Sequence, residues 1–105
     1  MTPRNQTDAI LSAIAQRHGM TLAKLVEQDK AWAWTQLRHQ VWLEASLELP
    51  DWSTTQLGKR LNRDHSTIVY GRQKAASIRY DLPPKSKWPV IQAAALAAIE
   101  VEKAA

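Results

Sequence analysis

Four short polar side chains follow one another in the middle of the chain: Asp64, His65, Ser66 and Thr67. Such residues can contact the edges of base pairs, since aspartate accepts from the cytosine amino group, histidine donates to a purine acceptor, and a threonine methyl packs on a thymine methyl. On the first turn of a helix, they can reach the floor of the DNA major groove. A simpler interpretation is that Asp64, Ser66 and Thr67 only cap that helix, but capping accounts for neither His65 nor the cations beside it.

Three cations, Lys59, Arg60 and Arg63, precede these four residues, which we call the polar run. Phosphates would lie beside these cations if the polar run faced DNA, and phosphate contacts position a protein without reading its target. Between residues 56 and 90 there are eight Lys or Arg and two acids, an excess of six that is larger than the net charge of +4 for the whole chain. We therefore expect one anion-facing side, although a solvated basic helix would give the same charge pattern.

The polar run lies at the junction of two expected helices. Ser53 followed by Gln56 is a capping-box pattern, which predicts a helix that begins near Thr54. Residues 62–64 have turn-forming chemistry and are expected to end this helix. The last of the three, an aspartate, can cap a second helix over residues 65–79.

The second helix carries an apolar stripe with a glycine in it. Gly71 costs about 1 kcal/mol of helix propensity relative to alanine, so its place on the buried face needs a reason. A close helix crossing would provide one, and we expect that crossing within a helix-turn-helix. The stripe consists of Ile68, Gly71, Ala75 and Ile78.

The longest helical pattern, residues 32–49, is expected to form the central helix of the core. It contains three of the five tryptophans, and the chain has no phenylalanine. Exposed tryptophans could stack on single-stranded nucleic acid, but in this composition they are needed to fill a small core. We therefore expect Trp34 and Trp42 to be packed, and Trp32, which lies outside the apolar stripe, to be exposed.

Helical periodicity extends over most of the chain, which predicts an all-α fold, a compact bundle of about six helices. Residues 1–6 are expected to be frayed, residues 7–80 to form the main domain, and residues 81–105 to be a Pro-broken linker with an Ala-rich C-terminal helix. The remaining helices are expected from Asp8, capped by Thr7, to a stop at Gly19; over residues 22–26, capped by Thr21; and from Ser86 or Lys87 to Ala104, with Trp88, Ile91, Ala95 and Ile99 on one face.

The composition argues against several classes of function. No Cys and three scattered His predict neither a disulfide nor a metal site. No apolar run approaches the roughly 20 residues that cross a bilayer, and the N-terminus is not signal-like, so we expect a cytoplasmic protein without a membrane partner. There is no glycine-rich phosphate loop, so nucleotide hydrolysis is not expected. Asp64 and His65 are adjacent and lack an accompanying nucleophile, so neither an enzyme nor a cofactor is expected.

Residues 63–71, Arg-Asp-His-Ser-Thr-Ile-Val-Tyr-Gly, resemble the signature of the C-terminal DNA-binding domain of the bacterial replication initiator DnaA. In that family, Arg-Asp-His-Thr-Thr is followed by apolar residues and an Ala. Short upstream segments follow the order and approximate spacing of the same domain, so the likeness covers residues 9–78. The resemblance implies an all-α, Trp-repressor-like bundle with a helix-turn-helix, and binding to double-stranded DNA.

The resemblance also implies roles for individual positions. The major-groove readers fall on Asp64, His65, Ser66 and Thr67, and the minor-groove arginine of the family falls on Lys30. Lysine keeps the charge there but lacks the planar guanidinium fork, so the preferred DNA site can differ from that of the initiator. Contacts to the DNA backbone or the minor groove would come from Lys30, Arg38, Thr54, Lys59, Arg60, Arg63 and Tyr70.

These expectations lead to a sequence-specific double-stranded DNA-binding protein, a small regulator of transcription or replication at the nucleoid without ATPase activity. The alternative is a protein-interaction module that uses the Trp-rich face or the C-terminal helix. The sequence leaves open whether that final helix packs on the core, pairs two chains in a homodimer or binds another protein.

Overall fold

Six α-helices and no strand make up the described part of the chain, which in this computed structural model is residues 4–104, with side chains from residue 6 onward. The predicted all-α class is therefore confirmed. The helices are α1 (Arg4–Arg17), α2 (Leu22–Val26), α3 (Trp32–Glu48), α4 (Thr54–Leu61), α5 (His65–Tyr80) and α6 (Trp88–Ala104).

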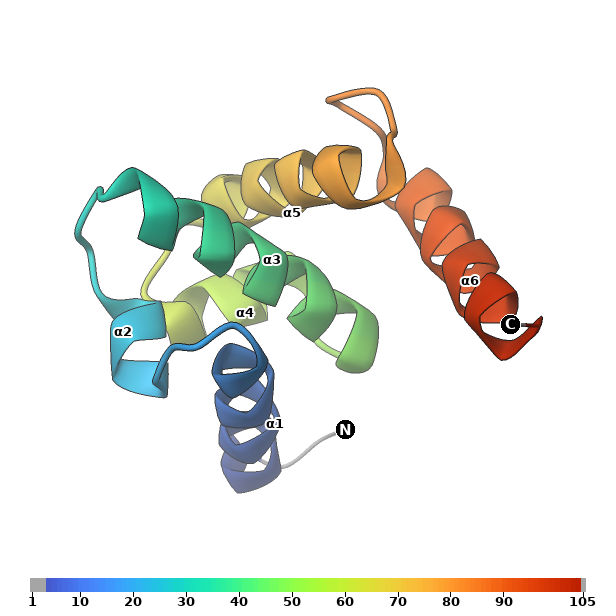
Figure 1. Cartoon of the computed structure of the whole chain (residues 1–105). Coiled ribbons are helices and arrows are strands. Elements are labelled where there is room, and N and C mark those ends of the chain that lie inside the picture. Colours follow the sequence, from blue (N-terminus) through green and yellow to red (C-terminus); the bar gives the residue numbers. More distant parts are fainter. Residues whose placement is uncertain (1–3, 105) are drawn as a thin grey trace.

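Helix α3 crosses the middle of the molecule, as Figure 1 shows, and packs against α1 and α5. Helix α5 also contacts α4 and α6, so it connects the main bundle with the C-terminal helix. The main core lies among α1 to α5, and a smaller cluster joins α3, α5 and α6. The largest buried side chains of the main core are Leu11, Ile14, Leu25, Val41, Trp42, Leu49, Leu57, Leu61 and Ile68.

The caps predicted around α4 and α5 are confirmed. Ser53 Oγ accepts from the Gln56 amide at 3.1 Å, and the Ser53 amide donates to Gln56 Oε1 at 2.8 Å, which completes the capping box. Asn62 ends α4 in the left-handed conformation, with φ of 58°. The Asp64 carboxylate then accepts from the Ser66 amide at 3.1 Å and starts α5. Local side-chain chemistry therefore sets the three-residue turn between the helices.

Gly71 lies at a close helix crossing, as predicted, but the helix it touches is α3 and not α4. A Cβ atom at this position would lie 2.5 Å from Cζ3 of Trp42 and 2.7 Å from Cδ2 of His39, both on α3. A second close contact lies between Gly58, within α4, and the turn. A Cβ atom at Gly58 would lie 2.5 Å from the Arg63 carbonyl oxygen. The chain thus uses one glycine for each of the two contacts that place the start of α5.

Some predicted boundaries and faces are wrong. Helix α1 begins at Arg4, so residues 4–6 are helical, and Thr7 is buried within the helix and does not act as its cap; residues 1–3 lie outside the described part. On α5, Ile78 is 63% exposed and Ala76 takes the buried place beside Ala75. The other three residues of the predicted stripe, Ile68, Gly71 and Ala75, are buried, so the prediction fails only at the C-terminal end of α5, where Ala76 packs with Ile91 of α6.

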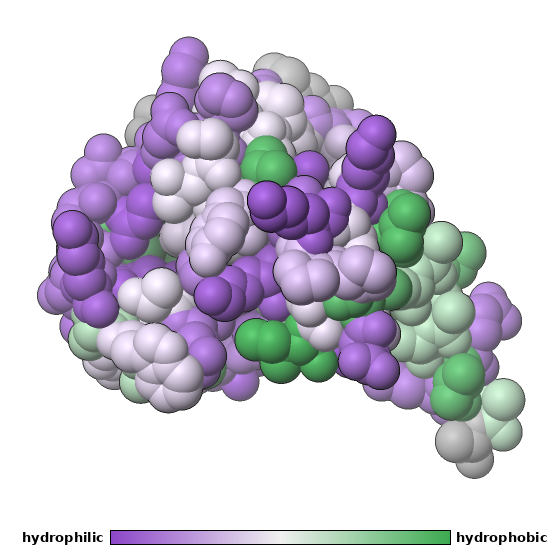
Figure 2. Space-filling model, turned by 90° about the horizontal axis from the view of Figure 1, so that it is seen from above, coloured by the Kyte–Doolittle hydropathy of each residue, from purple (hydrophilic) through white to green (hydrophobic). Residues whose placement is uncertain are grey.

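The C-terminal helix is only partly packed. On the predicted apolar face of α6, Ile91 and Ala95 are buried, while Ile99 is exposed. The distal half of α6 projects from the bundle, and Figure 2 shows hydrophobic colour along this arm beside a mostly hydrophilic face. Leu96 and Val101 are also exposed on it. Among residues 4–104, no helix has the length and apolar character that a membrane span needs.

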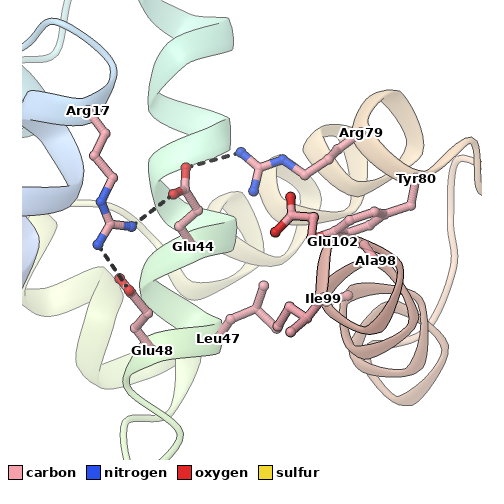
Figure 3. A pocket seen from close by; sticks show the side chains of 10 residues that line it. Arg17, Glu44, Leu47, Glu48, Arg79, Tyr80, Ala98, Ile99 and Glu102 are labelled. Atoms are coloured by element: carbon pink, nitrogen blue, oxygen red, sulfur yellow. Dashed lines mark hydrogen bonds and ion pairs between the residues drawn. The ribbon is translucent and has the colours of Figure 1, made fainter. Parts of the chain in front are cut away.

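A cleft of about 720 Å³ separates this arm from α1 and α3, and Figure 3 shows Leu47 and Ile99 pointing toward each other across it. Glu44 accepts hydrogen bonds from Arg17 Nη1 at 3.2 Å and from Arg79 Nη2 at 3.0 Å. Its other partner is His18. Glu44 thus joins α1, α3 and α5 on the wall of the cleft.

Substituting Gly71→Ala is expected to destabilise the fold. Overpacking costs about 1–3 kcal/mol, which exceeds the gain of about 1 kcal/mol in helix propensity. The measurement is urea denaturation of the variant and of the same change in a Trp42→Leu background, where the cost should shrink because the indole is gone. A Gly71→Ala chain more stable than the wild type would contradict the packing described at this crossing.

Candidate nucleic-acid interface

The polar run forms the exposed start of α5, but its four side chains are not equally free. Asp64 accepts from both the amide and the hydroxyl of Ser66, and these hydrogen bonds hold the pKa of the carboxyl below its ordinary value. The side chains of His65 and Thr67 make no hydrogen bond within the described chain and are exposed. Capping therefore occupies Asp64 and Ser66, while the side chains of His65 and Thr67 are exposed to solvent.

Arg63 ties the turn to the end of α2. Its guanidinium donates to the carbonyl oxygens of Val26 at 3.3 Å and Glu27 at 2.5 Å. The same group lies 5.8 Å from the ring centroid of Trp42, and burial lowers the pKa of Arg63. Because two of its donors satisfy the last carbonyls of α2, Arg63 serves first to position the turn.

Arg38 was expected to contact DNA, and that expectation is wrong, since its side chain is only 2% exposed. Its guanidinium donates to the Lys24 carbonyl at 2.9 and 3.1 Å, to the Asp29 carbonyl at 3.2 Å and to the Asp29 carboxylate at 3.1 and 3.3 Å. Arg38, followed by Lys24, holds the pKa of the Asp29 carboxyl far below its ordinary value. A buried cation here fixes the loop between α2 and α3.

That loop brings Lys30 to the same side as the polar run. Gln28 Nε2 donates to the Asn62 carbonyl at 2.7 Å, which joins the loop to the turn before α5. Lys30, Asp64 and Thr67 line one hollow of about 320 Å³. Lys30 itself is exposed. The structure thus brings together a loop cation and two members of the polar run that lie more than 30 residues away in the sequence.

The remaining candidates lie in different surroundings. Arg60 donates from Nε to Asp8 of α1 at 2.5 Å, and this hydrogen bond raises the pKa of Arg60. Lys59 is exposed on α4, and Thr54 is a half-buried residue at the start of that helix. Tyr70 is 56% exposed one turn after Thr67. Lys59 and Tyr70 therefore remain available for an external contact, while Arg60 is already paired.

A second hollow adds residues that the sequence reasoning did not assign to the site. A groove of about 420 Å³ runs between α3 and α5, and Trp32, Thr67, Tyr70 and Lys74 line it. Lys74 lies one helical turn after Tyr70 and donates to its hydroxyl at 3.3 Å. The spacing of Thr67, Tyr70 and Lys74, at i, i+3 and i+7, was the signal that could have identified Lys74.

The tryptophans do not form an exposed face. Trp42 is buried, and Trp34 and Trp52 are partly buried against the main core, whereas Trp32 is 74% exposed. Both expectations for these side chains, packing for Trp34 and Trp42 and exposure for Trp32, are confirmed. A stacking surface built from several tryptophans is therefore not present among the described residues.

The site combines a polar helix start with unbonded His65 and Thr67, an exposed loop lysine and a nearby tyrosine. Comparisons with protein-family models, with curated proteins and with solved structures found no match for this chain. Support for a function of this chain therefore comes from the geometry of the site and from the residue pattern at positions 63–71.

Arg38→Met is expected to destabilise the chain by about 3 kcal/mol or more, because a buried, charged hydrogen-bond network loses its centre. Lys30→Met, in the same loop but at an exposed position, should change the unfolding free energy by less than about 0.5 kcal/mol. Chemical denaturation of the two variants measures both effects. Equal stability of the two variants would show that Arg38 does not hold the loop.

His39 should make the fold less stable in mild acid. Its ring lies 5.1 Å from that of Trp42 and 6.1 Å from that of Tyr70, and burial, followed by the charge of Lys74, lowers the pKa of His39. The unfolded chain then binds this proton first, at its ordinary pKa of about 6.5, so stability is full above that pH and falls as the pH decreases toward the folded-state pKa.

The measurement is the unfolding free energy of the wild type and of His39→Gln between pH 7.5 and 5. The wild type should lose more stability on acidification, by at most about 1.4 kcal/mol per pH unit, the limit for one proton. Identical slopes for the two chains would exclude His39 as the titrating group.

Proposed function

We propose that the protein binds double-stranded DNA sequence-specifically, and that α4, the turn at residues 62–64 and α5 act as a helix-turn-helix. The observation that carries this proposal is the first turn of α5, where His65 and Thr67 are exposed and make no hydrogen bond within the described chain. Exposed, unbonded polar groups at the start of a well-capped helix match the residues with which recognition helices contact base edges.

The charged residues would have different roles in DNA binding. Lys59 and Lys30 are exposed and would contact phosphates, or in the case of Lys30 the minor groove, on either side of the polar run. Arg38 and Arg63 use their guanidinium groups within the protein and would act by positioning the loop and the turn. Tyr70 would extend the contact along α5.

The resemblance of residues 63–71 to the DnaA DNA-binding signature supports the same function. Because the chain has no glycine-rich phosphate loop, we propose a small regulator of transcription or replication at the bacterial nucleoid that does not hydrolyse nucleotides. Its DNA site would differ from that of the initiator family, because Lys30 replaces an arginine fork.

The projecting half of α6 favours a second candidate, a protein-interaction function. Leu96, Ile99 and Val101 expose apolar side chains there, and such a patch is typical of an interaction surface. A homodimer through α6 would also double the number of base pairs that are read. Sedimentation of the wild type and of Ile99→Glu tests for a homodimer through α6. If the wild type is a dimer, the substitution should reduce the sedimenting mass to that of a monomer; if it is a monomer, the mass should not change.

Selection from a random duplex pool at a stated salt concentration tests the DNA proposal. A preferred sequence should be enriched, and His65→Ala should weaken binding to it by about tenfold and relax the preference at one base pair. Lys59→Ala should weaken binding to all duplexes by the same factor and reduce the slope of log K against log salt concentration by about one.

Lys103→Ala, which removes an exposed cation at the end of α6, is the control and should change neither quantity. Enrichment of no duplex, or equal binding by the wild type and His65→Ala, would refute the proposed function.

A further inference from the structure

The loop between α5 and α6, residues 81–87, is hydrogen-bonded to α5. Ser77 Oγ donates to the Leu82 carbonyl at 2.7 Å, and Gln73 Nε2 donates to the Ser86 carbonyl at 3.2 Å. The Ser86 residue is itself buried. Figure 1 shows this loop at the C-terminal end of α5. Two polar side chains of α5 therefore give the loop a defined position.

A hollow of about 420 Å³ lies between α5 and this loop, and we call it the loop hollow. Its polar lining consists of Tyr70, Lys74 and Lys85, together with Gln73 and Ser77, which hold the loop. No aspartate or glutamate lines it. The loop hollow thus combines two lysines with neutral hydrogen-bonding groups.

Both lysines of the loop hollow are exposed and form no ion pair within the described chain, whereas Arg17, Arg60 and Arg79 are each paired with an acid. The Lys74 ammonium donates to the Tyr70 hydroxyl at 3.3 Å. Because an ammonium cannot accept, the Tyr70 oxygen is the acceptor of this bond and keeps its own O–H proton for another acceptor. The loop hollow therefore offers two ammonium groups and one hydroxyl proton to an anion.

The loop hollow is continuous with the polar run. Thr67 and Tyr70 line the groove between α3 and α5, and Tyr70 also lines the loop hollow. Lys74 follows Thr67 by seven residues, which is about 10 Å along the helix axis. The major groove is about 12 Å wide. With Thr67 at the base edges, Lys74 and the loop would therefore lie near the phosphates that border the groove.

We propose that the loop hollow binds a phosphate of the DNA backbone. Lys85 and Lys74 would pair with its charge, and the Tyr70 hydroxyl would donate to one of its oxygens. This inference rests on the proposed function and extends it beyond the residues that resemble the DnaA domain, because Lys85 follows residue 78. Phosphate contacts fix the orientation of a protein on a duplex without reading its sequence. The loop would therefore set the angle at which α5 enters the groove.

The first test measures the duplex affinity of the full chain as a function of salt concentration. Lys85→Met should weaken binding by about threefold, reduce the slope of log K against log salt concentration by about one and leave the preferred sequence unchanged. Lys103→Met, which removes an exposed cation at the end of α6, is the matched control and should change none of these quantities. Equal slopes for the wild type and Lys85→Met would overturn the contact.

The second test locates the contact on the duplex by replacing one phosphate at a time with a neutral methylphosphonate. At one or two neighbouring positions, the replacement should weaken binding of the wild type by about threefold. The same replacement should not weaken Lys85→Met further, because the partner of that phosphate is already gone. Equal losses for the two chains at every position would overturn the pairing of Lys85 with a phosphate.

A third variant tests whether the position of the loop matters. Ser77→Ala removes the donor to the Leu82 carbonyl without removing a charge. It should weaken duplex binding in the wild-type background, by at most the factor lost in Lys85→Met, and have no effect in the Lys85→Met background. Unchanged binding by Ser77→Ala, or equal losses in the two backgrounds, would overturn the positioning role of Ser77.

These measurements separate this inference from the proposed function. Suppose that the wild type binds the duplex pool without enriching a sequence, and that Lys85→Met binds it more weakly and with a smaller slope. This result would refute sequence-specific binding and leave the phosphate contact standing. Enrichment of a duplex with equal slopes for the two chains would do the reverse, and a wild type that binds no duplex would refute both.

Discussion

The indole ring of Trp42 against Gly71 is the contact on which the candidate site depends. Since Gly71 has no Cβ, the ring can lie against the backbone of α5, and the same ring lies 5.8 Å from the guanidinium of Arg63 in the turn. One buried side chain of α3 therefore supports both the helix and the turn that precedes it. Gly58 sets the second boundary, because a side chain there would collide with the Arg63 carbonyl. The direction of the first turn of α5 follows from these two close contacts.

The cations of this protein fall into two groups, those bonded within the protein and those exposed at its surface. Arg38 and Arg63 donate to backbone carbonyls and hold the loop before α3 and the turn before α5 in place. Lys30 and Lys59 are exposed, and they remain for contacts with another molecule. A count of positive charge in the sequence includes both kinds, so it overstates the number of cations that are available at the surface. The positioning arginines explain how a distant loop comes to share a hollow with the start of α5.

Much of the fold could be predicted because its signals are local. The capping box at Ser53 and the aspartate cap at Asp64 involve neighbours within three residues. Both caps are predicted from the sequence, and both are present in the structure. The burial of Arg38 and the pairing of Arg60 with Asp8 could not be predicted in this way. Their partners come from other helices, and a periodic pattern within one helix carries no information about them. The exposure of Ile78 could not be predicted for the same reason, since the position of α6 decides which face of α5 is covered.

The central claim is that the start of α5 enters the major groove beside the Lys30 loop. The most direct test is paramagnetic broadening of the protein's amide signals by a spin label on the selected duplex. A nitroxide would be attached at the C5 position of a thymine in the middle of the preferred site, where it projects into the major groove. The account predicts that amide signals of residues 62–70 broaden most, followed by those of residues 28–32, while α1 and the distal half of α6 stay sharp. Strongest broadening in α1 or α6, with sharp signals at residues 62–70, would contradict the account.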